Sequence, residues 1–361
     1  MTGGSACDEC LARSWLLGRL AAHLDVERGR IIALLDLGEE DLIRAVAGRD
    51  AAAVRAERLA FDAGAYRERC ADAGLGLICR CDAGYPSALW ALPAEPAVLH
   101  VAGQLPRLAA LTAGEGVAIV GARRASPYAL EAARSLARGL GRAGVTVISG
   151  MASGIDAAAH EGALDARGAS IAVLPAASQR PYPPAARALH GRLIAAGAVV
   201  SELGPDVAVR RWMFPARNRL IAALGAMVVV VAARRRSGAL LTAELAQTLE
   251  RPVGAVPGQV TAPLSWGPHA LIKRGAFLVT EPADVLEVLF GSDGVPVAAG
   301  PGPAPAAELQ PLYEALADGH APAEAFQQAG LDTVRGLAAL AALELGGFIH
   351  RRPGGHFSIA G

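Results

Sequence analysis

Lysine is almost absent from this chain of 361 residues, because Lys273 is the single lysine among 34 basic residues. Aromatic residues make up only 4%. The longest apolar run, residues 220–233, has 14 residues and is too short to cross a bilayer. It predicts the end of a helix followed by a buried strand. Residues 1–18 lack the basic start, apolar stretch and cleavage site of a secretory leader, so we expect a cytoplasmic protein with no membrane partner.

Cysteine is also scarce, with five residues at positions 7, 10, 70, 79 and 81. An odd number without an export signal favours reduced thiols over disulfides. Cys7-x-x-Cys10 and Cys79-x-Cys81 together offer four zinc ligands. However, a one-residue gap is awkward for zinc, and the two pairs lie about seventy residues apart. We therefore expect ordinary buried or surface cysteines and no metal site.

The composition is that of a folded protein, with 53% hydrophobic and 19% charged residues. A chain of this length predicts two or three domains. The net charge is zero, but residues 1–116 carry 12 basic and 16 acidic groups, residues 117–290 carry 19 and 11, and residues 291–361 carry 3 and 7. The excess of positive charge in the middle indicates an anion-binding region.

The middle region alternates short apolar runs with longer amphipathic segments. The strands are predicted at 117–120, 145–149, 170–174, 198–201, 227–231, 253–256 and 276–279. The helices between them are predicted at 129–140, 155–167, 185–196 and 240–250. This alternation predicts an α/β fold with a Rossmann-like, doubly wound, mostly parallel sheet. Such sheets bind ligands beyond the carboxyl ends of their strands.

Two flanking regions differ from this pattern. Residues 1–80 predict a small all-α domain of the SAM or helix-hairpin-helix kind, with helices at 11–23, 26–35, 39–47 and 51–73. Residues 81–292 form the Rossmann-like core, and the Pro/Gly/Ala-rich residues 293–307 a linker. Residues 308–361 predict three short helices and a two-stranded ribbon, which is the winged-helix arrangement.

The loop after the first middle strand begins at Gly121 and carries Arg123 and Arg124. Ser126 is the expected N-cap of the next helix, with Pro127 at its first position. Free amides at a helix start beside two arginines would seat a phosphate, although an ordinary cap with solvated arginines explains the pattern equally well. The fingerprint G-x-G-x-x-G is absent, which argues against NAD or FAD, and we expect no cofactor.

The loop after the next strand repeats this arrangement with Ser149, Gly150 and Gly154. Asp156 and His160 follow at i, i+4 on one helix face, a spacing that permits a metal site or an acid–base pair. We favour a simpler interpretation, in which Asp156 serves the first turn of the helix and His160 is a partly buried hydrogen-bonding residue.

Residues 210–219, RRWMFPARNR, interleave four arginines with two aromatic residues before a predicted helix. Binding of single-stranded nucleic acid needs this combination, because aromatic faces stack on bases while guanidinium groups hold phosphates. The alternative is that Trp212 and Phe214 belong to the core and the arginines to the surface.

Several blocks now point to a known family. In chain order they are VAIVGARRASPYALEAARSLARGLGRAGVTVISGMASGIDAAAHEGAL, RPYPP, FPARNRLIAAL, SGALLTAELA, AVPG and LIKRGA. Together they resemble the signature blocks of the DNA-processing protein A (DprA/Smf) family over roughly residues 85–290. The resemblance implies that the protein binds and protects incoming single-stranded DNA and loads the RecA recombinase during natural transformation. It also implies a homodimer.

The resemblance also implies the site residues. Gly121 and Arg123 match the phosphate loop, Arg180 matches a basic position facing DNA, and Ser237, Gly238 and Thr242 match a later loop. The expected nucleic-acid-binding residues are Gly121, Arg123, Arg124, Ser149, Gly150, Gly154, Arg180, Arg211, Phe214, Arg217, Asn218, Arg219, Ser237, Gly238 and Lys273.

This chain departs from the family pattern at several positions. Ala122 stands where Ser is usual, Ser153 where Arg is common, and His269 where Asn is usual, while residues 175–179 replace a Gly-x-Gly-x-Asp motif. These changes remove side-chain contacts, and we expect Arg124 and the arginines at 234–236 to compensate.

Two other functions compete with DNA binding. Gly238, Thr242 and Glu244 resemble part of a nucleotide phosphoribohydrolase site, but the doubled glycines of those enzymes are missing. A winged-helix transcription regulator is the second alternative, although three arginines against seven acids after residue 290 form a poor footprint for duplex DNA. The loops contain no set of nucleophile, base and orienting group, so we expect no catalysis.

Overall fold

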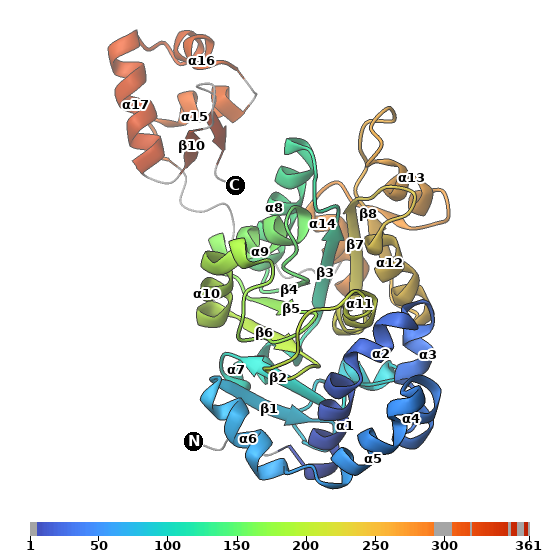
Figure 1. Cartoon of the computed structure of the whole chain (residues 1–361). Coiled ribbons are helices and arrows are strands. Elements are labelled where there is room, and N and C mark those ends of the chain that lie inside the picture. Colours follow the sequence, from blue (N-terminus) through green and yellow to red (C-terminus); the bar gives the residue numbers. More distant parts are fainter. Residues whose placement is uncertain (1–5, 292–304, 318–319, 346–347, 352–356, 360–361) are drawn as a thin grey trace. The chain divides into compact units, whose positions relative to one another are not determined.

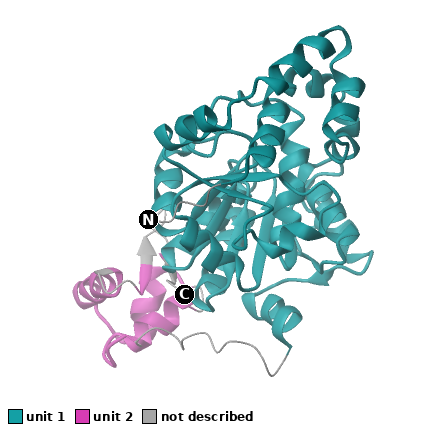
Figure 2. Ribbon diagram, turned by 90° about the horizontal axis from the view of Figure 1, so that it is seen from below, with its two compact units in different colours: residues 1–296 teal, residues 297–361 magenta. Residues whose placement is uncertain are grey.

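The described part of the chain contains one large sheet of nine strands and a separate two-stranded ribbon (Figure 1). The computed structural model describes residues 6–291, 305–317, 320–345, 348–351 and 357–359. It divides into two compact units, residues 1–296 and 297–361 (Figure 2). No helix in these described ranges is both long and apolar enough to span a membrane.

The strand order of the large sheet is β1-β2-β6-β5-β4-β3-β7-β8-β9, and the strands from β6 to β9 in this order are parallel. The strands are β1 (Leu75–Cys79), β2 (Val98–Ala102), β3 (Gly116–Gly121), β4 (Thr146–Ser149), β5 (Ser170–Val173), β6 (Ala198–Ser201), β7 (Met227–Ala232), β8 (Val253–Ala255) and β9 (Phe277–Leu278). Strands β3 to β9 coincide with the seven predicted strands. The predicted doubly wound, mostly parallel fold is confirmed.

Strands β1 and β2 were not predicted. They extend the sheet in antiparallel fashion, with Leu75 opposite Ala102 and with β2 paired to β6. β1 follows directly on a helix, and its five residues include a glycine, so its short apolar run does not distinguish a strand from the end of a helix.

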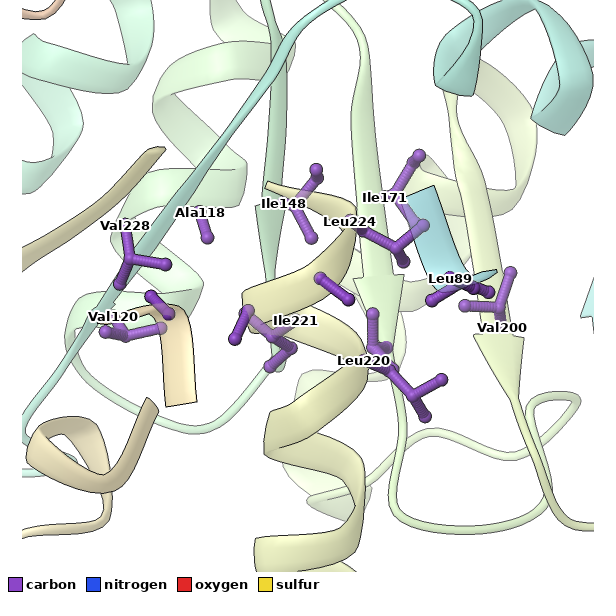
Figure 3. Packing of buried hydrophobic residues seen from close by; sticks show 14 of the residues in the cluster. Leu89, Ala118, Val120, Ile148, Ile171, Val200, Leu220, Ile221, Leu224 and Val228 are labelled. Atoms are coloured by element: carbon purple, nitrogen blue, oxygen red, sulfur yellow. The ribbon is translucent and has the colours of Figure 1, made fainter. Parts of the chain in front are cut away.

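Helices cover both faces of the sheet. The helices that follow the first 100 residues in this unit are α7 (Leu105–Thr112), α8 (Pro127–Arg142), α9 (Ile155–Asp165), α10 (Arg187–Ala196), α11 (Met213–Leu224), α12 (Gly238–Thr248), α13 (Trp266–Ile272) and α14 (Pro282–Phe290). Successive residues of a strand point to opposite faces. Val117 and Ile119 therefore pack with α8, α9 and α14. Ala118 and Val120 pack on the other face against α11, which presents Leu220, Ile221 and Leu224 (Figure 3).

The N-terminal region is helical as predicted, apart from β1, but the single helix predicted at 51–73 is two helices, Ala51–Leu59 and Ala63–Asp72. Its helices are α1 (Asp8–Arg19), α2 (Ala21–Val26), α3 (Ile31–Leu35), α4 (Glu39–Val46), α5 (Ala51–Leu59) and α6 (Ala63–Asp72), and short 3-10 helices occur at Arg28–Arg30, Gly48–Asp50, Ser87–Ala91 and Pro184–Ala186. These helices share a core with the start of α11 through Trp212, Met213 and Ala216. The indole Nε1 of Trp212 donates to the carbonyl oxygen of Ala21 at 2.9 Å. This shared core explains why residues 1–296 form one unit.

The second unit contains α15 (Gln310–Ala317), α16 (Pro322–Gln328), α17 (Thr333–Leu345) and the antiparallel strands β10 (Ile349–Arg351) and β11 (Phe357–Ile359). Three helices followed by a ribbon match the predicted winged-helix arrangement. A small core around Leu312, Phe326 and Leu343 holds them together. The predicted linker lies largely outside the described residues.

Candidate nucleic-acid interface

The sheet has its topological switch between β3 and β7. Starting from β3, the chain builds outward through β4, β5 and β6, and then returns to place β7 on the other side. A crevice forms beyond the carboxyl ends of the strands at such a point. The structure has a cavity of ≈ 350 Å³ there. Its walls include seven of the predicted site residues: Gly121, Arg123, Phe214, Arg217, Asn218, Ser237 and Gly238.

Arg123 and Phe214 meet at this cavity. The guanidinium carbon of Arg123 lies 4.9 Å from the centroid of the Phe214 ring, within the range of a cation–π contact. The ring of Tyr182 lies beside Phe214 with centroids 5.7 Å apart. Tyr182 was quoted in the RPYPP block but was not predicted as a site residue. The loops after β3 and β5 and the start of α11 thus join a cation to two aromatic rings.

The cavity also receives the start of α12. Ser237 caps this helix, because its Oγ accepts from the backbone N–H of Ala239 at 3.3 Å. Asn218 Nδ2 donates to the carbonyl oxygen of Gly238 at 3.2 Å, which ties α11 to this turn. Gly238 and Arg236 are exposed. The positive end of α12 and the Arg236 side chain therefore favour an anion in the cavity.

Arg217 supplies a buried positive charge. Its Nη1 donates to the carbonyl oxygen of Val173 at 2.7 Å. Gly150 lies against the guanidinium, and a Cβ at that position would come within 1.8 Å of Nη1. Burial, partly offset by the nearby carboxylate of Asp156, lowers the pKa of Arg217 to about 10, so the group stays charged at neutral pH. Arg217 thus acts as a fixed charge in the cavity wall rather than as a mobile contact.

The loop after β4 supports the loop after β3. Ser149 is buried and donates its hydroxyl to the carbonyl oxygen of Ile119 at 2.6 Å. Ile155 N donates to the carbonyl oxygen of Ala122 at 3.2 Å. Gly154 has a φ of 87°, and a Cβ there would lie 2.3 Å from the Ala122 oxygen. Ser149, Gly150 and Gly154 do not line the cavity, and their contacts position the neighbouring loop and Arg217, so their contact with nucleic acid stays a prediction.

Asp156 and His160 are hydrogen-bonded within the protein, as the simpler of the two interpretations above expects. Asp156 is buried and accepts from the backbone N–H of Ala152 at 3.4 Å. Burial raises the pKa of Asp156, and Arg217 acts in the opposite direction. His160 is also buried, with Nδ1 2.7 Å from the hydroxyl of Ser170. Burial, with a further contribution from Arg217, lowers the pKa of His160 to about 3.

Arg219 was predicted to contact nucleic acid, and this prediction is wrong. Its Nη2 lies 2.6 Å from Glu202 Oε1, and the two side chains are only 2% and 9% exposed. Helix α11 begins at Met213, so the predicted groove segment is mostly helical. Two positions along a helix correspond to a rotation of about 200°, which places Arg219 and Arg217 on opposite sides. Trp212 belongs to the core, whereas Phe214 lines the cavity.

The exposed arginines around the cavity have no carboxylate partners in the described part of the chain. Arg123, Arg124, Arg180, Arg211 and Arg236 are exposed and form no ion pair there. Arginines of the N-terminal helices behave differently. Most arginines of α1 to α6 pair with a glutamate or an aspartate, as Arg19 does with Glu57 and Arg55 with Glu40. Arg123 and Arg236 therefore place unpaired positive charge in the cavity wall.

Arg235, in the loop after β7, and Trp266, at the start of α13, form a second contact between an arginine and an aromatic ring. The Arg235 guanidinium carbon is 4.7 Å from the centroid of Trp266, whose side chain is 36% exposed. Trp266 was not predicted as a site residue, although SWGPH directly precedes the last family block. Lys273 lies exposed after the far end of α13 and is not among the residues that line the cavity.

The arrangement does not reproduce a phosphoribohydrolase site. Glu244 is exposed on α12 and does not line the cavity. Thr242 donates its hydroxyl to the carbonyl oxygen of Gly238 at 3.3 Å. Among the described residues that line the cavity, Asp156 is the only carboxylate, and it accepts a backbone amide.

A mostly parallel sheet covered by helices, with a cationic, aromatic-rimmed cavity at its switch point, defines this chain as a Rossmann-like α/β protein. Comparison of its sequence with known families identifies the family to which it belongs. The family model of DNA recombination-mediator protein A matches residues 76–290, and the chain belongs to that family of DNA-processing proteins. The resemblance to DprA/Smf is confirmed.

Individual relatives agree with this assignment. The putative DNA processing protein DprA of Mycobacterium tuberculosis is 41% identical over 278 residues, which cover 74% of this chain and 68% of the relative. Protein Smf of Escherichia coli is 40% identical over 288 residues, covering 76% and 75%.

Solved structures show the same fold. DNA processing protein A of Streptococcus pneumoniae aligns with a TM-score of 0.62 and 32% identity, covering 77% of this chain and 95% of the other. DNA processing protein A of Helicobacter pylori, studied for its mode of binding single-stranded DNA, aligns with a TM-score of 0.52 and 30% identity, covering 56% and 92%.

Proposed function

We propose that this protein binds and protects single-stranded DNA in the cytoplasm and loads the RecA recombinase onto it during natural transformation. The observation that carries DNA binding is the contact between Arg123 and Phe214 at the rim of the switch-point cavity. Loading of RecA and the setting of natural transformation rest on the resemblance to the family.

In this proposal a backbone phosphate occupies the cavity. The start of α12, Arg236 and the fixed charge of Arg217 attract it, and Arg123 closes over it. The adjacent bases stack on the faces of Phe214 and Tyr182. Stacking on aromatic rings tolerates any base, so the preference for sequence is weak.

The protein acts without catalysis in this proposal. The cavity offers cations, amides and aromatic faces, and its carboxylate, Asp156, is already engaged. A homodimer, expected from the family resemblance, would extend the binding track over a longer strand.

The test compares fluorescently labelled single-stranded and duplex oligonucleotides by anisotropy across a salt series. We expect tighter binding to the single strand and a steep fall in affinity with salt, because binding releases counterions from DNA. A preference for duplex DNA would favour the winged-helix regulator instead. Incubation with nucleoside monophosphates, with detection of released base, tests the phosphoribohydrolase alternative.

Loading of RecA has a separate test. RecA filament formation is followed on oligonucleotides already covered by a single-strand-binding protein, with and without this chain. We expect the chain to accelerate filament formation, and the Phe214→Ala variant to lose most of the acceleration. An unchanged rate with the wild-type chain contradicts loading but leaves DNA binding standing.

A further inference from the structure

Four of the five cysteines come together in the fold. Cys7 lies just before α1 and Cys10 in its first turn, while Cys79 ends β1 and Cys81 follows two residues later. Their Sγ atoms all lie within 4.8 Å of one another. Cys70, the fifth, is not part of this group. The separation in sequence that argued against a shared site is closed by the packing of α1 beside the end of β1.

The spacing of the sulfurs fits a single metal ion. Cys81 Sγ lies 3.8 Å from Cys7 Sγ and 3.8 Å from Cys10 Sγ. Four sulfurs at about 2.3 Å from a tetrahedral zinc ion are separated by about 3.8 Å. All five cysteines are free thiols rather than disulfides. An iron–sulfur cluster distributes its thiolates over several irons and so holds them farther apart than one ion does.

The surroundings suit a group of thiolates. The backbone N–H of Cys7 donates to Cys79 Sγ at 3.5 Å. Arg80 interacts with the sulfur of Cys10 and also pairs with Glu95 at 2.5 Å, so its charge is shared between the group and that carboxylate. Cys10 and Cys79 are only 3% and 1% exposed, whereas Cys81 is exposed. Amide donors and a nearby cation are typical of the outer shell that supports metal-bound thiolates.

We propose that Cys7, Cys10, Cys79 and Cys81 form a structural site for one zinc ion. Four protein ligands leave no open position for a substrate, so the ion has no catalytic role. It joins the first helix of the N-terminal region to the edge of the sheet. Each ligand binds as a thiolate, and the thiol protons pass to solvent.

Metal analysis of the untagged full-length chain tests the site directly. The protein is produced with added zinc, purified without chelators and analysed by elemental mass spectrometry and X-ray absorption. We expect about one zinc per chain, with four sulfur neighbours at about 2.3 Å. A chain with only traces of metal, or zinc held by nitrogen and oxygen, overturns the proposal.

Two serine variants supply a matched comparison. Cys81→Ser removes an exposed ligand, and Cys70→Ser removes a buried cysteine outside the group. We expect Cys81→Ser to lose most of its zinc and to unfold at a lower temperature, while Cys70→Ser retains one equivalent. Equal zinc in both variants contradicts the site.

A measurement on the wild-type chain covers the case in which Cys81→Ser does not fold. The thiols are titrated with an organomercurial while a metal-sensitive dye records released zinc. Release in step with thiol modification supports the site, and absence of release contradicts it. None of these measurements depends on DNA binding.

Discussion

Arg123 and Phe214 lie 91 positions apart in the sequence, yet the guanidinium carbon of one lies 4.9 Å from the ring centroid of the other. Arg123 lies in the loop that follows β3, and Phe214 lies in the first turn of α11. Their contact brings an exposed cation and an aromatic face to the same rim of the cavity. Single-stranded DNA requires this pairing of charge and stacking surface.

Replacing Phe214 by alanine removes the stacking face and leaves the fixed charges in place. We expect the affinity for single-stranded DNA to fall by about 1–3 kcal/mol, the usual contribution of one stacked base. Anisotropy at constant salt measures this change. Trp90→Ala is the control, because Trp90 is exposed and does not line the cavity. Equal affinity of the two variants would place the stacking surface elsewhere.

Arg123→Ala and Arg236→Ala each remove one exposed, unpaired cation at the cavity. We expect each to lower the slope of log affinity against log salt by about one, because each phosphate contact releases about one counterion. Arg44→Ala is the matched control, since Arg44 is exposed but pairs with Asp41 on α4. A slope that changes as much in the control as at the cavity contradicts this prediction.

Arg219→Ala should affect stability. The change leaves Glu202 buried without its partner, and we expect the free energy of unfolding to fall by about 3–5 kcal/mol. Urea denaturation measures this loss, and the folded variant should keep its DNA affinity. The double change Arg219→Met with Glu202→Leu should recover much of the stability, because it removes both buried charges. A loss of affinity without loss of stability would return Arg219 to the binding site.

The stability of the protein should fall in mild acid. Burial lowers the pKa of His100 to about 4 and that of His160 to about 3, both below the unfolded value of 6.5. The unfolded chain therefore takes up protons below pH 6.5 that the folded chain does not, and the free energy of unfolding decreases as the pH falls. At pH 5 each ring contributes a loss of about 2 kcal/mol.

Urea denaturation at pH 7, 6 and 5 measures this decline. His160→Asn should show a shallower decline than the wild-type chain. The difference between the two chains isolates this ring from Asp156, whose raised pKa acts in the opposite direction. Parallel declines in both chains contradict the assignment to His160.

The local sequence pattern is enough to place the strands of the parallel sheet and the loops that line the cavity. Apolar runs with β-branched residues repeat from Val117 to Val279, and this local pattern decides where each strand lies. The two-strand extension at the edge escaped prediction, because β1 follows directly on a helix and neither strand belongs to the alternation of strand and helix that marks the parallel part. Gly121, Arg123 and Ser237 line one cavity, because a parallel sheet brings the carboxyl ends of its strands to one edge.

Only the packing of the folded chain decides which side chains of these segments face the cavity. Arg217 and Arg219 belong to one basic run, but the N-terminal helices cover one side of α11 and leave the other to the cavity. Tyr182 joins Phe214, and Cys7 meets Cys79, only through packing between distant segments. The hydrophobic periodicity of a segment predicts whether that segment is a helix or a strand. It does not predict which distant segment packs against each face of the helix or strand.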